Sequence, residues 1–353
     1  MSKKKIMFFL PALDVGGAER VTVNIIRYLN PNNYEIHLVM VQKKGLFLEH
    51  IPHYVTLHDL GVKKTMFSIF RLRKVIRKIE PAIIYSTLIR THVAVYFALK
   101  NISHQVKIVM RMPSSPKLMM EEGSGNIINK FILTKALKKA NIVVAQTPEM
   151  KDEIEFYYNV NRENVKVLLN ILDKKNINKS IQNQTSPFDS KNINVVASGL
   201  VRHIKGFDTL ILAFKEVYMK NKKFRLHIIG RDLNGQTVEY EKLVLSLGLE
   251  GIVSFLGYQS NPYRYYFYSD LFVLSSRREG LPNVVLENLY LNKPIVATRC
   301  VPFMSTIIQE GVNGFLVDIN DAKSLAMAII NFKEIKKPTL YLSDKYSSIE
   351  DIF

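Results

Sequence analysis

Short apolar runs alternate with helical segments along almost the whole chain, and this alternation constrains the fold more than any other feature. In the first half, apolar runs lie at 5–10, 36–41, 55–60, 83–86, 106–111 and 142–146, with helical segments at about 18–29, 66–80, 90–100 and 126–139. Such short runs are typical of strands buried on both faces of a parallel sheet. The alternation therefore predicts an α/β fold in which helices cover both faces of a mostly parallel sheet.

A polar stretch divides this pattern in two. Residues 174–192 contain no buried pattern, and the alternation restarts with an apolar run at 193–199. The chain has 353 residues, which is about twice the length of a typical domain. We therefore expect two doubly wound, Rossmann-like domains that face a central cleft, formed by residues 1–170 and 193–339, with a linker or exposed loop at 171–192. Ligands of such sheets bind beyond the carboxyl ends of the strands.

The N-terminus begins like a signal peptide but does not continue as one. Basic residues at 3–5 precede an apolar run, which Pro11 and Asp14 interrupt. No window approaches the roughly 18 consecutive apolar residues that a spanning helix needs. We therefore expect a buried first strand. The single cysteine, Cys300, excludes an internal disulfide framework.

The net charge of +18 is unevenly distributed along the sequence. Residues 1–180 hold 29 Lys and Arg against 14 Asp and Glu, a net charge of +15, whereas residues 181–353 have a net charge of +3. A basic half favours a polyanionic partner, such as nucleic acid, anionic lipid or an acidic polymer. The alternative is a solvated basic surface without a dedicated partner.

Residues 63–79 combine aromatic and basic residues in a helical pattern. Phe67, Phe70, Val75 and Ile79 approximate one helical stripe, with arginines and lysines around it. Basic amphipathic helices lie on anionic membranes, so this segment is a candidate for docking on an anionic inner membrane surface. The same stripe could instead pack on the first sheet. Lysine-rich residues at 130–139 form a second candidate.

The densest motif follows an apolar run in the second half. Residues 275–287 read Ser-Ser-Arg-Arg-Glu-Gly-Leu-Pro-Asn-Val-Val-Leu-Glu. The proline suits the first turn of a helix, and the free N–H groups of Asn283 and Val284 at its start would attract an anion such as a diphosphate. Glu279 in the loop and Glu287 in the helix can hydrogen-bond two separate hydroxyl-bearing rings.

This motif resembles the Glu-x₇-Glu signature of glycosyltransferase family four, whose members are retaining, nucleotide-sugar-dependent enzymes with a GT-B fold. In that family the first Glu contacts the donor sugar and the second contacts the nucleotide ribose, and Glu279 and Glu287 match these positions. The resemblance covers almost the whole chain. It implies that residues 1–170 form the acceptor-side domain, that residues 193–339 bind the donor, and that a C-terminal helix at 340–353 packs back onto the first domain.

Other segments resemble the family's motifs residue by residue. Lys205 matches a lysine that neutralises the donor phosphate. Gly16 and Gly17 are similar to the family's N-terminal glycine turn, where glycines let the backbone approach a phosphate or sugar closely. The resemblance thus implies nucleotide-sugar binding by Gly16, Gly17, Lys205, Gly230, Arg231, Gly257, Glu279, Gly280, Leu281, Asn283, Val284 and Glu287.

The chain departs from the family pattern at three places. The family usually has an Arg where this chain has Leu200, and we hypothesise that Arg202 supplies the missing cation. Thr306 stands near the place where the family has a Glu. In members of the family, the first domain often has a His at the place that corresponds to Arg111 of this chain. His92 is the nearest alternative catalytic residue.

The implied reaction moves a sugar from a nucleotide diphosphate sugar to a glycan or lipid-linked acceptor in surface polysaccharide biosynthesis. Charge develops on the leaving diphosphate, and cations or helix N–H groups aimed at it lower the barrier. Lys205, Arg202 and the helix start at Asn283 can do this without a metal, and the chain contains no Asp-x-Asp motif. We expect Glu279 to position the sugar, no residue to act as a clear nucleophile, no cofactor or metal, and a UDP-sugar donor rather than a GDP-sugar.

This interpretation predicts a cytoplasmic protein that is peripheral at the inner face of the plasma membrane. There are two alternatives: a non-catalytic or donor-defective relative that binds nucleotide sugars or glycans, and a same-fold nucleotide-sugar epimerase. A nucleic-acid-binding module is a further alternative, but no helix-turn-helix, RRM or zinc pattern accompanies the charge, so we expect no nucleic acid partner.

Overall fold

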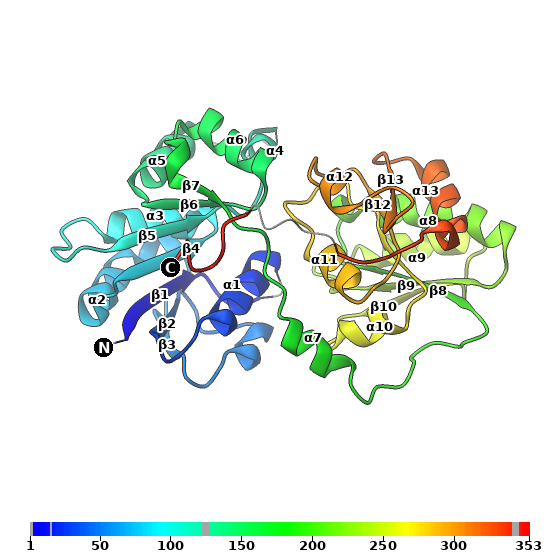
Figure 1. Ribbon diagram of the computed structural model, residues 1–353, viewed down its shortest axis with the longest axis horizontal. Coiled ribbons are helices and arrows are strands. Elements are labelled where there is room, and N and C mark those ends of the chain that lie inside the picture. The colour runs from blue at the N-terminus through cyan, green and yellow to red at the C-terminus, as the bar shows by residue number, and fades with distance from the viewer. Residues whose placement is uncertain (1–2, 15, 122–126, 341–345) are drawn as a thin grey trace. The chain divides into compact units, whose positions relative to one another are not determined.

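The structure is a computed structural model that describes residues 3–14, 16–121, 127–340 and 346–353, and it divides the chain into two compact units (Figure 1). The first unit comprises residues 1–173 and 344–353, and the second comprises residues 174–343. Each unit is built on one parallel sheet. The expected α/β fold with two doubly wound sheets is therefore confirmed.

The sheet of the first unit has seven parallel strands in the order β3-β2-β1-β4-β5-β6-β7. Its strands are β1 (Lys4–Leu10), β2 (Tyr34–Met40), β3 (Thr56–Asp59), β4 (Ile83–Thr87), β5 (Lys107–Arg111), β6 (Ile142–Ala145) and β7 (Val165–Val167). The helices between them are α1 (Gly17–Tyr28), α2 (Ile69–Ile79), α3 (Ile89–Ala98), α4 (Pro116–Glu121), α5 (Ile127–Lys139) and α6 (Pro148–Tyr158), with 3-10 turns η1 (Leu46–His50), η2 (Thr65–Ser68) and η3 (Arg162–Asn164).

Both faces of this sheet are buried because successive side chains of each strand point to opposite sides. In β1, Met7 and Phe9 join a core that includes residues of α2, α3, α5 and α6. Ile6 and Phe8 join the opposite core, which α1 covers. The continuous apolar runs of the sequence follow from this two-sided burial.

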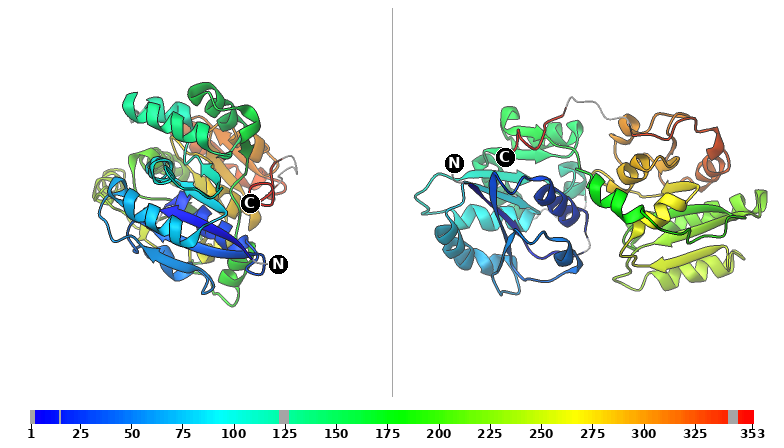
Figure 2. Two further views of the ribbon diagram at one scale, coloured as in Figure 1. Left: turned by 90° about the vertical axis from the view of Figure 1, so that its left-hand side faces the viewer. Right: turned by 60° about the horizontal axis from the view of Figure 1, so that its bottom comes forward.

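The C-terminal segment belongs to the first unit but is not helical. Residues 346–353 form turns and bends, so the expected helix at 340–353 is wrong for these residues. The segment is nevertheless held: Ile352 and Phe353 are buried against the α1 side of the sheet, and Lys4 Nζ donates to Phe353 O at 2.7 Å. Figure 2 accordingly shows both ends of the chain in this unit. Buried apolar side chains and a bond from Ser347 N to Val167 O at 2.9 Å fix the segment without a regular helix.

The second unit has a six-stranded parallel sheet in the order β10-β9-β8-β11-β12-β13. Its strands are β8 (Ile193–Ser198), β9 (Phe224–Ile229), β10 (Val253–Gly257), β11 (Leu271–Leu274), β12 (Ile295–Thr298) and β13 (Gly314–Val317). Its helices are α7 (Lys174–Ile181), α8 (Phe207–Lys220), α9 (Thr237–Ser246), α10 (Pro262–Tyr268), α11 (Asn283–Tyr290), α12 (Met304–Ile307) and α13 (Ala322–Ile330), with 3-10 turns η4 (His203–Lys205) and η5 (Phe332–Glu334).

The polar stretch expected as a linker contains helix α7. Ile177 is its buried residue, and Asn178 accepts a hydrogen bond from the Tyr290 hydroxyl at 3.1 Å. Asn261 Nδ2 also donates to Ser180 O at 2.7 Å. One buried isoleucine among polar neighbours is too weak a periodic signal to predict a helix, which here depends on its packing against the second unit.

The division into units also changes the distribution of charge. Three lysines between 174 and 180 belong to the second unit, while acidic residues at 344, 350 and 351 belong to the first. The first unit therefore has a net charge of +10 and the second a net charge of +8. The interpretation that one half carries nearly all the charge is wrong, and any polyanion site has to be found locally. Among the described residues, no helix combines the length and apolar character needed to cross a bilayer.

Candidate functional site

The loop between β11 and α11, residues 275–282, ends where helix α11 begins without a side-chain cap. Pro282 occupies the N-cap position with an extended backbone, and no side chain accepts from the first turn. The first N–H groups of a helix have no partner inside the helix. Asn283 and Val284, both half-buried, are the first two residues of this turn. The helix start therefore offers donors and a partial positive charge to an anion.

Two of the predicted site residues, one in η4 and one in this loop, contact each other. The Lys205 ammonium donates to Glu279 Oε1 at 2.6 Å, and the Ser276 hydroxyl donates to the same oxygen at 2.7 Å. Only 20% of the Lys205 side chain and 16% of the Glu279 side chain are exposed. The structure thus brings together the cation expected at the diphosphate and the carboxylate expected at the sugar, 74 residues apart in sequence.

Glu287, the second carboxylate of the motif, lies on α11 and is buried. Its exposed fraction is 1%, and Oε1 accepts a hydrogen bond from the Tyr263 hydroxyl at 3.3 Å. A buried carboxylate is retained only when hydrogen-bond donors surround it. The α11 helix therefore holds Glu287 in a fixed position, eight residues beyond Glu279.

Glycines allow the segments around this site to approach closely. Gly206 has a φ of +63°, and a Cβ there would lie 2.1 Å from Ser275 O. Gly230 approaches Gly199 so closely that a Cβ would lie 1.7 Å from Gly199 O. Beside them, a Cβ on Gly199 would press on the Lys205 side chain at 3.0 Å. These glycines are required by packing at the carboxyl ends of β8 and β9, whatever they contact in a ligand.

The sequence interpretation gave no role to Arg277, which connects the β11–α11 loop to the segment that contains Lys205. Its guanidinium donates to both oxygens of Asp208, at 2.8 and 2.7 Å, and also to His203 O. Burial raises the pKa of the Asp208 carboxyl, but the hydrogen bonds and charge of Arg277 outweigh it, so that the pKa is lowered overall. The pair ties the β11–α11 loop to η4 and the start of α8. An Arg in the loop after a buried strand, and an Asp in the first turn of a helix, were the available signals.

Arg202 and Arg231 lie at the same end of the sheet, with exposed side chains. Arg202 precedes η4, and its carbonyl accepts from Lys205 N at 2.8 Å. Its side chain makes no hydrogen bond or ion pair with any residue that the structure describes. Arg231 O accepts from Val201 N at 3.0 Å, which holds the β8 and β9 ends together. Arg202 is thus available to a ligand, and its replacement of the cation missing at Leu200 stays a prediction.

The segment after β12 contributes a residue that sequence reasoning missed. Cys300 is buried, and its thiol pKa is raised to about 12 by burial and, second, by the negative charge of Glu279. It is therefore a neutral thiol within electrostatic reach of Glu279 and Lys205. Thr306 is exposed on α12, so the structure places no carboxylate at that position. The Thr298 hydroxyl, at the end of β12, donates to Ser276 O and so anchors the β11–α11 loop to the neighbouring strand.

The remaining predicted residues are spread over both units. Gly257 is exposed with a φ of +65°, and nothing lies within 4 Å of the position of a Cβ there. Gly280 is half-buried in the β11–α11 loop, and Leu281 is buried. Gly16 and Gly17 open α1 in the first unit, where Gly16 has an extended backbone and is not in the left-handed region. A Cβ on Gly16 would meet the Glu19 carboxylate at 2.2 Å.

His92 is enclosed in the core of the first unit. Its Nδ1 shares a 2.8 Å hydrogen bond with the Ser86 hydroxyl, and burial lowers its pKa to about 3. The ring is therefore neutral at physiological pH, and its buried Nε2 has no hydrogen-bond partner among the described residues. The expected catalytic role of His92 stays a prediction.

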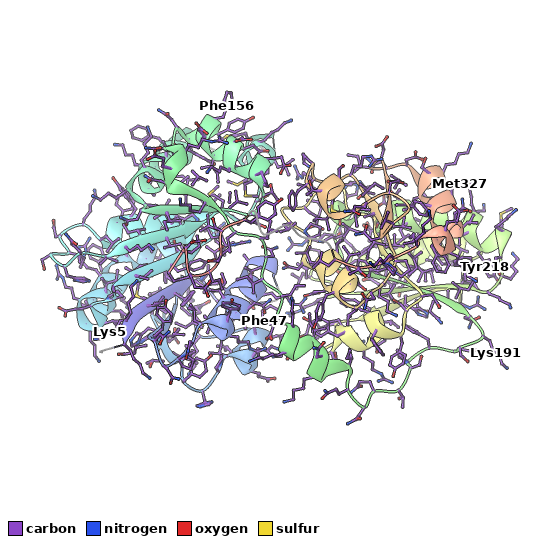
Figure 3. All side chains as sticks on the ribbon, in the orientation of Figure 1. Lys5, Phe47, Phe156, Lys191, Tyr218 and Met327 are labelled. Carbon is purple, nitrogen blue, oxygen red and sulfur yellow. The ribbon has the colours of Figure 1, made fainter. Side chains whose placement is uncertain are left out.

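The basic segment at 63–79 presents two aromatic side chains to solvent. Phe67 is 70% exposed and Phe70 is 74% exposed, whereas Leu72, Ile76 and Ile79 face the core. The expected stripe is therefore wrong at Val75 and Ile79, since Ile79 is buried and Val75 packs partly buried against the same core, whereas the phenylalanines lie on a different face. Among the second candidate residues, Phe131 is 59% exposed, and Figure 3 shows Phe156 projecting outward from the nearby helix α6.

Comparison with known proteins identifies the family. The model described as Glycosyltransferase Family 4 matches residues 15–175, and the model described as Glycosyl transferases group 1 matches residues 178–345. An uncharacterized glycosyltransferase of Methanocaldococcus jannaschii is 28% identical over 65% of this chain, and the match spans 59% of that relative's length.

Two further proteins are similar over nearly their full lengths. A Campylobacter jejuni enzyme named N-acetylgalactosamine-N,N'-diacetylbacillosaminyl-diphospho-undecaprenol 4-alpha-N-acetylgalactosaminyltransferase is 22% identical over 95% of this chain and 91% of its own length. The solved structure of HepE from Anabaena in complex with UDP has the same fold, with a TM-score of 0.73 at 22% identity over 93% of this chain and 89% of its own. Together, the two models and these relatives show that the chain belongs to the family-four glycosyltransferases, with the GT-B fold.

Proposed function

We propose that this protein transfers a sugar, with retention of anomeric configuration, from a nucleotide diphosphate sugar to a lipid-linked or polysaccharide acceptor in surface glycan biosynthesis. The observation that carries the proposal is the contact between Lys205 and Glu279 beside the uncapped start of α11. It places a cation, a carboxylate and free helix N–H groups together in the second unit.

The chemistry of the leaving group accounts for this arrangement. Negative charge grows on the diphosphate as the bond to the sugar breaks, and fixed positive groups stabilise it most. Lys205 and the start of α11 can meet the diphosphate directly, and Arg202 adds an exposed cation on the same turn. Glu279, displaced from Lys205 by the diphosphate, would accept hydrogen bonds from the sugar hydroxyls. This route needs no metal, and we propose that the transfer is unaffected by chelators.

The donor is proposed to be a UDP-sugar. HepE was solved with UDP, and the C. jejuni relative is named for transfer of N-acetylgalactosamine to a diphospho-undecaprenol acceptor. By analogy, the acceptor of this chain would be linked to a lipid. We propose that the protein reaches such an acceptor as a peripheral protein on the inner face of the plasma membrane. Exposed Phe67 and Phe70 beside the lysines of 63–78 suit an anionic bilayer surface.

Donor binding is the first test, and thermal shift measures it. The full chain is titrated with UDP-glucose, UDP-N-acetylglucosamine, GDP-mannose and ADP-glucose, because a ligand of the folded state raises Tm with its concentration. A UDP-sugar should raise Tm, and Glu287→Gln should weaken the shift at least tenfold in concentration. Glu241→Gln, an exposed residue of α9, is the matched control. An equal shift in Glu287→Gln would argue against the site.

Transfer is the second test and separates an enzyme from a donor-defective relative. Release of UDP is followed with a prenyl-diphosphate-linked sugar as acceptor, with and without EDTA. Donor binding without acceptor-dependent UDP release would favour the binding relative, in which the absence of a carboxylate at Thr306 would be the cause. Loss of turnover in EDTA would contradict the metal-free route.

A further inference from the structure

Buried polar atoms without hydrogen-bond partners gather at the carboxyl ends of two neighbouring strands in the first unit. Among the described residues, nine buried side-chain atoms have no partner, and three of them belong to β4 and β5: Tyr85 Oη, Thr87 Oγ1 and Arg111 Nε. Native proteins satisfy most buried polar groups, so a concentration of exceptions calls for an absent partner.

Arg111 is the most unusual member of this group. It is the last residue of β5, is 2% exposed, and is among the largest fully buried side chains. Its guanidinium bonds to the neutral Asn170 side chain and forms no ion pair with a described Asp or Glu. By contrast, Arg277 and Arg27 each meet a carboxylate at 2.7 Å. A buried guanidinium keeps its charge and is costly to bury without an anion.

The hydroxyl groups lie on the same face of the sheet as this arginine. Thr87 is the register partner of Arg111 across the parallel pair, so their side chains leave the sheet on the same side. Tyr85 lies two residues earlier on β4 and faces the same way. Burial raises the pKa of Tyr85 to about 12, against the opposing influence of the Arg111 charge and of the nearby Thr22 side chain, so its hydroxyl keeps a proton to donate. Guanidinium and hydroxyl donors thus converge on one edge of the sheet.

The position of this edge favours a ligand over a purely structural role. Carboxyl ends of parallel strands are where doubly wound sheets bind ligands. The backbone also departs from ordinary geometry there: Leu88, directly after β4, has a φ of +82°, a conformation that is strained for a leucine. A cluster that only served packing would more simply hold apolar side chains.

We propose that Tyr85, Thr87 and Arg111 form a subsite for a phosphate group of the acceptor. Planar guanidinium groups bind phosphate oxygens through two parallel hydrogen bonds, and the two hydroxyls donate to the remaining oxygens. The proposal rests on the proposed function, because it assigns the anion to the acceptor and not to the donor. The phosphate could belong to a lipid-linked diphosphate or to a soluble sugar phosphate.

The test measures anion binding to the full chain by calorimetry, with saturating UDP present to occupy the donor site. The probes are inorganic pyrophosphate and farnesyl diphosphate. We expect saturable binding, weakened at least tenfold by Arg111→Met and about threefold by Thr87→Val or Tyr85→Phe, each of which removes a donor with little change of shape. Arg77→Met, on the exposed face of α2, is the matched control and should bind normally. Much tighter binding of farnesyl diphosphate than of pyrophosphate would indicate a lipid-linked phosphate. Equal affinities for the two probes would indicate a soluble sugar phosphate.

The outcomes keep this subsite separate from the donor site. If UDP raises Tm but Arg111→Met and the two hydroxyl variants bind pyrophosphate as the wild type does, the subsite is refuted and the proposed function stands. If UDP does not bind, the proposed function fails, and the same titration in a Lys205→Met background still tests the subsite. Without anion, the Tm of Arg111→Met should equal or exceed that of the wild type, whereas a structural arginine would give a lower Tm. Should Arg111→Met not fold, Thr87→Val and Tyr85→Phe decide the question.

Discussion

Replacing Arg277 by Met tests whether a single ion pair holds the site of the second unit together. Arg277 donates to both Asp208 oxygens, at 2.8 and 2.7 Å, and 17% and 31% of the two side chains are exposed. Its backbone N–H also donates to Ile204 O at 2.8 Å, a bond that Met would keep. The substitution therefore removes the side-chain link between the β11–α11 loop and η4 while the backbone link remains.

The geometry sets the expected size of the effect. Hydrogen bonds to charged groups contribute about 1.5–3 kcal/mol, and exposed ion pairs only about 0–1 kcal/mol. This partly buried pair lies between these limits, so we expect a loss of about 2 kcal/mol in the free energy of unfolding. For a unit of this size that corresponds to a fall in Tm of roughly 4–8 °C. Scanning calorimetry of the full chain measures it, in the transition that UDP raises.

A double-mutant cycle with Asp208→Asn isolates the pair from the bond to His203 O. The coupling energy should be about 1–2 kcal/mol. Arg202→Met, whose exposed side chain has no partner among the described residues, should leave Tm unchanged and serves as the control. A coupling energy below about 0.3 kcal/mol would refute the view that this pair organises the loop, because that is the additivity error for independent sites.

The pH dependence gives an independent check. The pKa of Asp208 is raised by burial but lowered overall by Arg277, so the folded value lies below the ordinary value of 3.8. The stabilisation is therefore complete above the ordinary pKa and is lost as the pH falls through the lower, folded value. The Tm difference between wild type and Arg277→Met should be constant from pH 5 to pH 7 and should shrink below about pH 4. A difference that persists undiminished at pH 2 would contradict the ion-pair explanation.

Three further predictions concern the same two regions. Lys205→Met should lower kcat about 10²–10³-fold, as loss of one stabilising donor does elsewhere, and should also lower Tm, because the largely buried Glu279 loses its ion pair; steady-state UDP release below the Tm of the variant measures kcat, and an undiminished kcat would contradict the role. Gly206→Ala should lower the free energy of unfolding by about 1–3 kcal/mol, because its φ is +63° and a Cβ would lie 2.1 Å from Ser275 O; equal stability in urea melts would contradict this. Phe67→Ser and Phe70→Ser should each weaken binding to anionic vesicles roughly tenfold and leave Tm within error, because burial of each exposed ring in the bilayer would contribute about 1.5–3 kcal/mol to binding. Sedimentation with vesicles measures the binding, and unchanged binding would exclude this face.

The fold was predictable from the sequence because two-sided burial leaves a strong signal. Strands such as β1 and β8 have few polar residues, and helices between them repeat at regular intervals. Elements whose stability depends on neighbours gave weaker signals. Helix α7 has one buried side chain, and β7 has three residues. Helix α6 lay outside the predicted elements, although Thr147 caps it and Pro148 follows, a start signal that could have been used.

The site was predictable only where function is tied to a compact motif. Glu279 and Glu287 lie in one continuous sequence motif and Lys205 lies in another, so the resemblance to the family could assign an expected role to each. Arg277 and Cys300 were missed because their roles depend on partners that only the fold brings near, Asp208 in one case and Glu279 in the other. Net charge misled for a similar reason: it was summed over a boundary that the fold places elsewhere.

The buried cations at the carboxyl edges of the two sheets differ in how they are paired, and the difference bears on specificity. At the carboxyl edge of the second sheet, Lys205 and Arg277 each meet a carboxylate, so the donor site is held in place by its own residues. At the corresponding edge of the first sheet, Arg111 and Thr87 have atoms without partners. A group that is costly to leave unpaired discriminates strongly in favour of the ligand that pairs with it. The donor site would therefore be fixed by ion pairs within the protein, whose residues belong to the family motifs. The choice of acceptor would instead depend on buried groups that are satisfied only when an anion of matching shape binds. Substitution of Arg111, Tyr85 and Thr87 should therefore change the preference for acceptors and leave the preference for donors the same.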